Sequence, residues 1–152
     1  MAERITLFII AKNEEFKISK CILSARELVS EIIVVDAFSK DKTAQVAKEF
    51  GAVAYQRAFD GFANQKNFAL SKVSSPWALN LDADESLSPA LVDEIRRVTA
   101  RTSCAGLNIP FSNYFLGKRM EHSGLNKEYH LRLVRTDKAH YEGGLVHEGL
   151  QV

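Results

Sequence analysis

The sequence predicts an α/β fold built on a mostly parallel, mixed sheet. Short runs of apolar, β-branched residues alternate along the chain with segments whose apolar residues recur at helical spacing. Polar clusters separate these runs, as expected where short turns join strands to helices. In the last third, strand-like runs follow one another without long helices, which predicts a mixed edge of the sheet.

The first strand and helix are predicted from two different hydrophobic periods. The run Ile5–Ala11 is nearly all apolar, which is typical of a strand buried on both faces. From Phe16 to Val29 the apolar residues recur at three- and four-residue steps, so we expect an amphipathic helix there. A second buried strand is expected over residues 31–36, where the sequence is Glu-Ile-Ile-Val-Val-Asp.

The following segment repeats this alternation. We expect helix 43–50, strand 52–56, helix 62–72 and strand 77–82. Either Ser39 or Asp41 can cap the first of these helices. A further helix begins at Ser88-Pro89, because a serine cap followed by proline is a typical helix start, and we expect it to end near Arg101.

The last third of the chain has a different pattern. We expect strands at 107–111, 114–117 and 130–134, with the loop 118–128 lying over the sheet. On the last of these strands, simple alternation places Leu131 and Leu133 on one side and His130 and Arg132 on the other.

Length and composition limit the class of protein. At about 150 residues per domain, the 152 residues predict one domain with a core of its own. Lysine plus arginine total 20 against 19 acidic residues, a net charge of +1 that argues against a nucleic-acid partner. We see no signal peptide and no apolar run near the roughly 18 residues of a membrane span, so we expect a cytoplasmic protein. Cys21 and Cys104 match no zinc spacing, and we expect reduced, buried thiols.

Polar side chains follow three of the predicted strands, at the edge where ligands of open α/β sheets bind. They are Lys12, Asn13, Glu14 and Glu15 after the first strand, Asp36 and Ser39 after the second, and Asp82, Asp84 and Glu85 after the fourth. So many carboxylates at one edge are costly unless a cation or donor hydroxyls compensate them.

The run Asp82-Ala83-Asp84-Glu85 is the most informative of these clusters. If the backbone stays extended, Asp82 and Asp84 point to the same side. Such a pair suits Mg²⁺ or Mn²⁺, which take one or two protein carboxylates and complete their shell with water and phosphate oxygens. The alternative is that these carboxylates cap the next helix.

Asp36 also has two interpretations. An acid at the end of an apolar strand commonly accepts hydrogen bonds from a ribose or a base. The alternative is a turn in which its side chain binds the backbone two or three residues on. The chain has no Gly-x-Gly-x-x-Gly and no Walker A sequence, which argues against dinucleotide binding and against a P-loop NTPase.

Together these motifs resemble the family 2 glycosyltransferases with the GT-A fold, and within them the lipopolysaccharide-core β-1,4-glucosyltransferase subgroup. The matching runs in the first half are Ala11–Glu15, Val35-Asp36 with Ser39–Thr43, Gln65-Lys66-Asn67 and Asp82–Glu85. Those in the second half are Asn113–Lys118, His122-Ser123-Gly124, His130–Leu133 and Val146-His147-Glu148.

The resemblance implies a three-layer α/β/α sandwich with a donor-binding half, residues 1–104, and an acceptor-side portion, residues 105–152. It implies inverting transfer of a hexose, expected to be glucose, from a UDP-sugar donor to a lipopolysaccharide-core, other glycan or lipid-linked acceptor. Peripheral membrane contact is compatible with such an acceptor. The sequence indicates no oligomeric state.

The resemblance also implies roles for single residues. Asp36 is expected to hold the uridine, with Asn13 and Glu14 nearby. Lys66 and Asn67 are expected beside the nucleotide or its diphosphate, although by themselves they are typical of an exposed helix face. The divalent metal is expected on Asp84, with Asp82 behind it or on the sugar.

The expected general base is Glu148, with Glu85 as the second candidate. His147 is a candidate late metal ligand, since neutral imidazole suits Mn²⁺. The alternative for His147-Glu148 is the start of a helix. Arg132 either contacts phosphate or lies on a solvated edge strand.

Two alternatives to an active glycosyltransferase remain open. The chain ends shortly after Glu148, where the family continues, so we expect the acceptor-side portion to be truncated. One alternative is therefore a catalytically inactive sugar-nucleotide-binding domain. The other is a sugar-1-phosphate nucleotidyltransferase, which would need a Gly-rich, basic loop where this chain has Lys12-Asn13-Glu14-Glu15.

Overall fold

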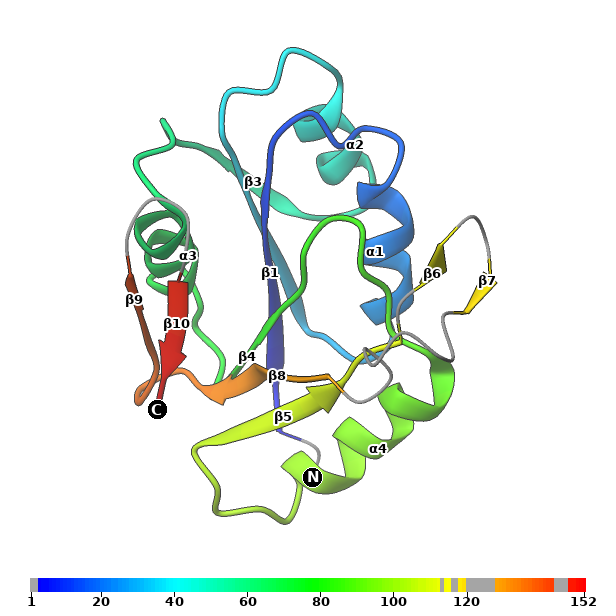
Figure 1. The fold of residues 1–152 in the computed structure, drawn as a ribbon, viewed down its shortest axis with the longest axis vertical. Helices are drawn as coiled ribbons and strands as arrows, with labels where there is room; N and C mark the ends of the chain where they lie inside the picture. The colour runs from blue at the N-terminus through cyan, green and yellow to red at the C-terminus, as the bar shows by residue number, and fades with distance from the viewer. Residues whose placement is uncertain (1–2, 113, 116–117, 120–127, 144–147) are drawn as a thin grey trace.

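The protein is built on a six-stranded mixed sheet with the strand order β3-β2-β1-β4-β8-β5 (Figure 1). The computed structural model describes residues 3–112, 114–115, 118–119, 128–143 and 148–152. The strands of this sheet are β1 (Ile5–Ala11), β2 (Glu31–Asp36), β3 (Val53–Gln56), β4 (Trp77–Asn80), β5 (Gly106–Pro110) and β8 (Tyr129–Arg135). Strands β3, β2, β1 and β4 run parallel, whereas β8 runs antiparallel to both of its neighbours. The predicted mixed, mostly parallel sheet is confirmed.

Helices cover both faces of the sheet, as the three-layer prediction requires. They are α1 (Ile18–Ala25), α2 (Thr43–Glu49), α3 (Phe62–Leu70) and α4 (Pro89–Thr99). One core cluster joins one face of the sheet to residues of α1, α2 and α4. The other cluster joins the opposite face to α3 and to Tyr141 of the hairpin formed by β9 (His140–Gly143) and β10 (Glu148–Gln151).

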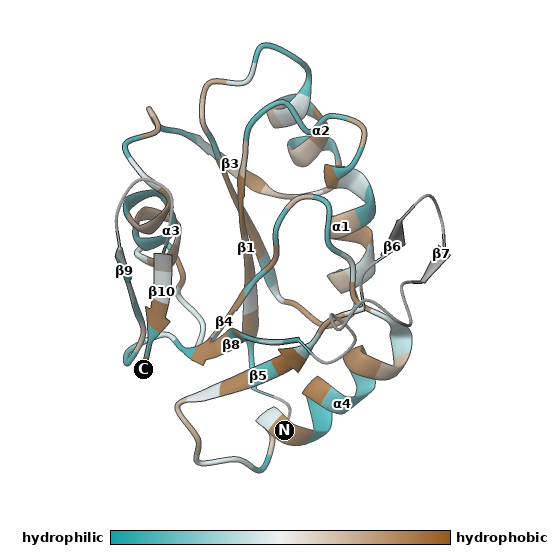
Figure 2. Ribbon diagram, in the orientation of Figure 1, coloured by the Kyte–Doolittle hydropathy of each residue, from teal (hydrophilic) through white to brown (hydrophobic). Residues whose placement is uncertain are grey.

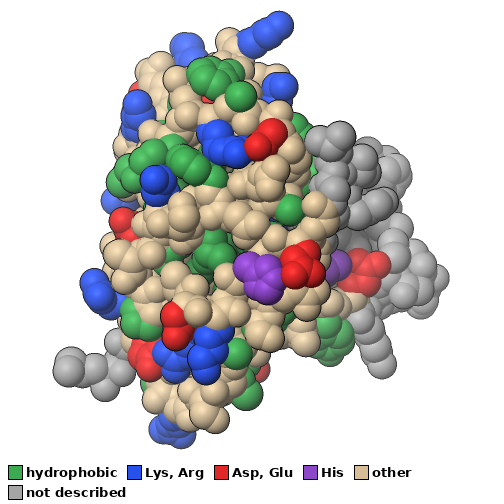
Figure 3. Space-filling view, turned by 90° about the vertical axis from the view of Figure 1, so that its left-hand side faces the viewer, with side chains coloured by type: hydrophobic (Ala, Val, Ile, Leu, Met, Phe, Trp, Pro, Cys, Tyr) green, Lys and Arg blue, Asp and Glu red, His purple; other side chains and the backbone are tan. Residues whose placement is uncertain are grey.

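The central position of β1 explains why its sequence is a continuous apolar run. Leu7 and Ile9 pack on the α1 face while Phe8 packs on the α3 face, and all three are fully buried. Figure 2 shows the same division, with hydrophobic strands inside and hydrophilic loops at the ends of the sheet. On the side that carries α3 and the hairpin, Lys and Arg side chains are spread among acidic ones (Figure 3).

The predicted element boundaries are close to the observed ones, with two informative differences. Helix α1 ends at Ala25 instead of Val29, and the chain turns there to enter β2. Strand β4 ends at Asn80 instead of Asp82, because the backbone turns so that Glu85 N–H donates to the Asp82 carbonyl at 2.9 Å. The extended continuation assumed for Asp82 and Asp84 is therefore wrong.

The helix caps follow the sequence chemistry. At α4, the Ser88 hydroxyl accepts a hydrogen bond from Leu91 N–H at 3.3 Å, and Pro89 occupies the first turn. Before α2, the Asp41 carboxylate accepts from Thr43 N–H at 3.0 Å, whereas Ser39 is bound to Asp36. Of the two candidates, Asp41 therefore serves the start of α2.

The second half of the chain departs most from the prediction. Strands β6 (Tyr114–Phe115) and β7 (Lys118–Arg119) pair antiparallel, so the expected loop 118–128 begins with a strand, and its residues 120–127 lie outside the described residues. The β9–β10 hairpin was not predicted at all. Within the described ranges, no helix is long and apolar enough to cross a bilayer.

A β-bulge in β8 overturns the alternation expected there. Leu107 pairs with Leu133 and Asn108 pairs with Leu131, which leaves Arg132 as the extra residue on β8. Leu133 consequently joins the core cluster of the α1 face, while Leu131 packs against that of the α3 face. The prediction that both leucines lie on one side is wrong, because the inserted residue interrupts the regular alternation and places Leu131 and Leu133 on opposite faces of the sheet.

The two cysteines differ in environment. Cys21 is buried on α1, as expected, but Cys104 is exposed in the turn before β5, so the prediction of a buried thiol is wrong there. Both are free, in agreement with the expected reduced state.

The burial of β4 predicts a large cost for truncating its side chains. We expect Leu79→Ala, which removes a fully buried side chain from the central sheet, to lower the free energy of unfolding by about 2–5 kcal/mol. The matched control is Leu23→Ala on α1, where the side chain is 50% exposed and the change should cost far less. Urea unfolding measures both, and equal losses in the two variants would contradict the assigned core.

Candidate functional site

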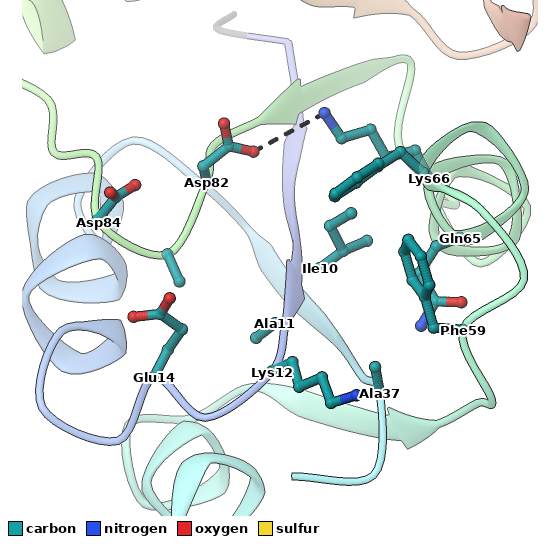
Figure 4. Close-up of a pocket in the computed structure, with 12 residues that line it drawn as sticks. Ile10, Ala11, Lys12, Glu14, Ala37, Phe59, Gln65, Lys66, Asp82 and Asp84 are labelled. Carbon is teal, nitrogen blue, oxygen red and sulfur yellow. Dashed lines mark ion pairs between the residues drawn. The ribbon is translucent and has the colours of Figure 1, made fainter. Parts of the chain in front are cut away.

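A cavity of about 540 Å³ opens at the carboxyl ends of β1, β2 and β4, where the sequence placed the ligand site (Figure 4). Its floor and walls combine apolar, acidic and basic side chains. They are Ile10, Ala11, Lys12, Glu14, Ala37, Phe59, Phe62, Gln65, Lys66, Asp82, Ala83 and Asp84.

The loop after β1 is tied to the loop after β2. Asn13 has a left-handed backbone, with φ of 57°, and its N–H donates to the Ser39 hydroxyl at 2.8 Å. Its side-chain oxygen accepts from Lys40 N–H at 2.9 Å. Asn13 therefore joins the two loops, while the neighbouring Glu14 lines the cavity.

The Asp36 carboxylate is fully buried and takes part in a local turn. It accepts hydrogen bonds from Ser39 N–H, at 3.0 Å, and from the Ser39 hydroxyl. Of the two interpretations of Asp36, the structure displays the turn, and the residue after β2 that lines the cavity is Ala37.

Helix α3 supplies a buried lysine to the cavity. Lys66 is only 4% exposed, and its Nζ lies 3.8 Å from Asp82 Oδ1 and 5.5 Å from the centre of the Tyr141 ring. The interpretation of Lys66 as an ordinary exposed helix residue is wrong. Asn67 has a structural role. Its side-chain N–H donates to the Tyr141 carbonyl and its side-chain oxygen accepts from Tyr141 N–H, both at 2.8 Å, which attaches β9 to α3.

Arg132 lies at the centre of a charged network beneath the loop after β4. Its guanidinium donates to Asn80 Oδ1 at 2.9 Å, to Asp82 Oδ2 at 3.0 Å and to Glu85 Oε1 at 2.7 Å. The side chain is only 12% exposed, since β8 lies between β4 and β5. The alternative of a solvated edge strand for Arg132 is therefore wrong.

In this network the pKa values of Asp82 and Glu85 are shifted in opposite directions. Burial raises the pKa of Asp82, but the positive charges of Arg132 and Lys66 outweigh it, and the pKa falls below its ordinary value. At Glu85 burial dominates over the attraction of Arg132, and the pKa lies above its ordinary value. Burial together with these carboxylates raises the pKa of the Cys21 thiol to about 12, and the thiol donates to the Asp82 carbonyl at 3.4 Å.

Asp84 is the carboxylate of the Asp-x-Asp motif that stays exposed. It lines the cavity in the turn after β4, whereas Asp82 faces Lys66 (Figure 4). Within the described part of the chain, no group of three His, Cys, Asp or Glu side chains is close enough to hold a metal by itself. A hard divalent cation fits here nonetheless, because Mg²⁺ and Mn²⁺ need only one or two protein carboxylates when a diphosphate supplies the other oxygens.

The expected general base, Glu148, lies in the unpredicted β9–β10 hairpin. Glu148 begins β10 and pairs with Gly143, so the alternative of a helix start there is wrong. His147 lies outside the described residues.

Phe59 and Phe62 line the cavity and were missed by the sequence reasoning. The signal that could have found them is a pair of phenylalanines flanking Asp60-Gly61 at the start of a helix. Such a pair is an unusual composition for a surface loop.

Comparison with known proteins agrees with the fold. Residues 6–147 match the model of the family described as Glycosyl transferase family 2. The chain is 34% identical to the lipopolysaccharide core biosynthesis glycosyltransferase LpsC of Rhizobium meliloti, over 96% of this chain and 56% of LpsC. It is 44% identical to an uncharacterized glycosyltransferase of Rickettsia felis, over 64% of this chain and 35% of that protein. The chain thus spans about a third to a half of the length of these relatives.

Among solved structures, the chain resembles glucosyl-3-phosphoglycerate synthase from Mycobacterium tuberculosis in complex with UDP. The TM-score is 0.50 at 26% identity, and the match covers 55% of this chain and 34% of that one. Together these matches confirm the resemblance inferred from the sequence motifs.

The Arg132 network predicts a pH-dependent contribution to stability. We expect Arg132→Met to lower the free energy of unfolding by roughly 1–3 kcal/mol at neutral pH, because it leaves two partly buried carboxylates without their cation. Because folding lowers the pKa of Asp82, its ionised carboxylate stabilises the fold at pH values above 3.8, the ordinary pKa of the group. This stabilisation is lost as the pH falls through the lower pKa that Asp82 has in the folded protein. The difference between wild type and variant should therefore shrink on acidification.

Urea unfolding at pH 7 and below pH 3.8 measures this difference. Arg101→Met, at an exposed position just after α4, is the control and should change stability little at either pH. A cost for Arg132→Met that is independent of pH would show that packing, and not charge, accounts for the role of Arg132.

Proposed function

Because the chain belongs to glycosyl transferase family 2, we propose that it binds a UDP-sugar in the cavity above β1, β2 and β4. We further propose that it transfers a hexose, glucose, to a lipopolysaccharide-core or related glycan acceptor. The UDP complex of the mycobacterial synthase supports the choice of nucleotide, and the name of the Rhizobium relative supports the class of acceptor.

One observation carries this proposal, the distribution of charge around the cavity. Asp84 and Glu14 lie on one side of it, and Lys66 and Lys12 lie toward the other (Figure 4). A nucleoside diphosphate with a bound divalent cation carries both signs of charge, and such a ligand is complementary to a site lined by both.

The metal proposed here is Mg²⁺ or Mn²⁺, held by Asp84 with Asp82 as the second carboxylate. When bound, it supplies Lewis-acid stabilisation of the departing diphosphate. The two carboxylates are not equivalent, since Asp82 is held by Arg132 and Lys66 whereas Asp84 is exposed to the cavity. We therefore expect Asp84 to be the primary ligand.

The chain's own cations contribute to the same step. Lys66 is buried at the edge of the cavity. We propose that its ammonium offsets the negative charge that grows on the departing diphosphate. Arg132 acts indirectly, by holding Asp82 and Glu85 in place.

The acceptor hydroxyl needs a general base, and we propose Glu148. Glu85 is the weaker candidate, because its carboxylate is held by Arg132 at 2.7 Å and accepts from Asp82 N–H at 2.9 Å. A base engaged in this way has to break structural hydrogen bonds before it can receive a proton.

The donor site is tested by ligand-induced stabilisation. UDP with Mn²⁺ at 100 times its Kd should stabilise the chain by about 2.7 kcal/mol, which corresponds to a rise in Tm of roughly 5–10 °C. Asp84→Ala should abolish the part of the shift that depends on Mn²⁺. Thermal unfolding with UDP, GDP and CMP, each with and without Mn²⁺, gives the comparison.

Asp93→Ala on α4, an exposed aspartate away from the cavity, is the matched control and should keep the full shift. A flat response of the wild type to UDP with Mn²⁺ would overturn the donor site. Binding of UDP without hydrolysis or transfer of any UDP-sugar would favour the inactive-domain alternative.

The assignment of the base is tested by Glu148→Gln and Glu85→Gln. If Glu148 is the base, Glu148→Gln lowers kcat by about 10²- to 10⁴-fold and leaves UDP affinity nearly intact, because general-base catalysis contributes about that much. Steady-state kinetics with UDP-glucose, together with UDP titration, separates the two effects. Near-normal turnover of Glu148→Gln combined with loss in Glu85→Gln would move the role to Glu85.

A further inference from the structure

Two phenylalanines stand exposed at one end of the cavity. Phe59 and Phe62 are 43% and 38% exposed, and their rings meet edge to face with centroids 5.0 Å apart. Both line the cavity. Two adjacent aromatic rings exposed on a cavity wall form an apolar surface of the kind that lines ligand sites.

The loop that carries Phe59 and leads into α3 at Phe62 is held by several polar contacts. Arg57 forms a two-pronged ion pair with Asp60, in which Nη2 donates to Oδ2 at 2.8 Å. Arg57 also donates to Gln65 Oε1 at 2.7 Å, and Gln65 returns a hydrogen bond of 3.3 Å to the Arg57 carbonyl. Gly61 has a φ of 127°, a conformation that L side chains rarely adopt. The aromatic surface is therefore presented before any ligand binds, which lowers the entropic cost of binding.

The cavity has two chemically different ends. Figure 4 shows Phe59 beside Gln65 on one side and Asp84 with Glu14 on the other, with Ile10 and Ala11 between them. A nucleotide sugar has the same division, because its planar base is separated by the ribose from a charged diphosphate. With the diphosphate at the acidic end, the base extends toward the phenylalanines.

The residue expected to hold the uridine is not positioned to do this alone. The Asp36 carboxylate is fully buried, and both of its oxygens accept hydrogen bonds from Ser39. The cavity wall near the end of β2 is the small side chain of Ala37. The large planar surfaces in the described lining of the cavity are those of Phe59 and Phe62.

We infer that Phe59 and Phe62 form the wall on which the nucleobase of the donor stacks. This inference rests on the proposed function, because it assigns part of the same donor site. Stacking on an aromatic ring is tolerant of base identity, since every base has a π-face. The pair therefore makes a nucleoside diphosphate bind more tightly than a diphosphate without a base. It does not by itself discriminate uracil from other bases.

The experiment compares a ligand that has a base with one that lacks it. Phe59→Ala and Phe62→Ala are titrated calorimetrically with UDP and with inorganic pyrophosphate, each in the presence of Mn²⁺. We expect the Kd for UDP to rise roughly 5- to 150-fold, the range typical of the loss of one stacking aromatic side chain. The Kd for pyrophosphate should stay unchanged, and Phe59→Tyr should bind UDP like the wild type.

Phe16→Ala is the matched control, because Phe16 is 90% exposed and is not among the cavity-lining residues. It should alter neither affinity. Unchanged UDP affinity in both alanine variants would overturn the inference while leaving the donor site in place. Equal weakening of UDP and pyrophosphate would also overturn it, because the pair would then only shape the cavity. Failure of the wild type to bind UDP would instead overturn the proposed function.

Discussion

The candidate site depends on the burial of one guanidinium between two acidic side chains and an amide. Arg132 binds Asn80 at the end of β4 and also both Asp82 and Glu85 in the loop that follows. This loop carries the carboxylates that we propose hold the metal, and without a cation beneath it three carboxylates would repel one another. A β-bulge makes the arrangement possible, because Arg132 is the extra residue that β8 inserts opposite β5.

The same network divides the Asp-x-Asp motif into two roles. Asp82 is held from both sides, by Arg132 and by the buried Lys66, and its pKa is lowered accordingly. Asp84 is left exposed in the cavity. One carboxylate thus stabilises the loop while the other is available to a cation, which is how a site can be charged and still belong to a stable fold.

The sequence-based predictions were accurate where the structure depends on residues close together in the chain, and they failed where it depends on residues far apart. Strands 5–11 and 31–36 were predicted to the residue, because both faces are buried and the apolar run ends where burial ends. The start of α4 was predicted because Ser88 and Pro89 act on their own helix. The edge of the sheet at which the cavity opens was also predicted, since it follows from parallel topology. The β9–β10 hairpin was missed, because its attachment through Asn67 joins residues far apart in the chain.

The sequence by itself determined the α/β class, the order of the strands along the chain and the acidic character of the loops at their carboxyl ends. These properties depend on hydrophobic period and on local turn chemistry, which neighbouring residues set. Only the tertiary structure decided that Lys66 is buried and that Arg132 turns inward to the loop after β4. The reason is that each depends on a partner from another element, or on an inserted residue that breaks the regular alternation of a strand.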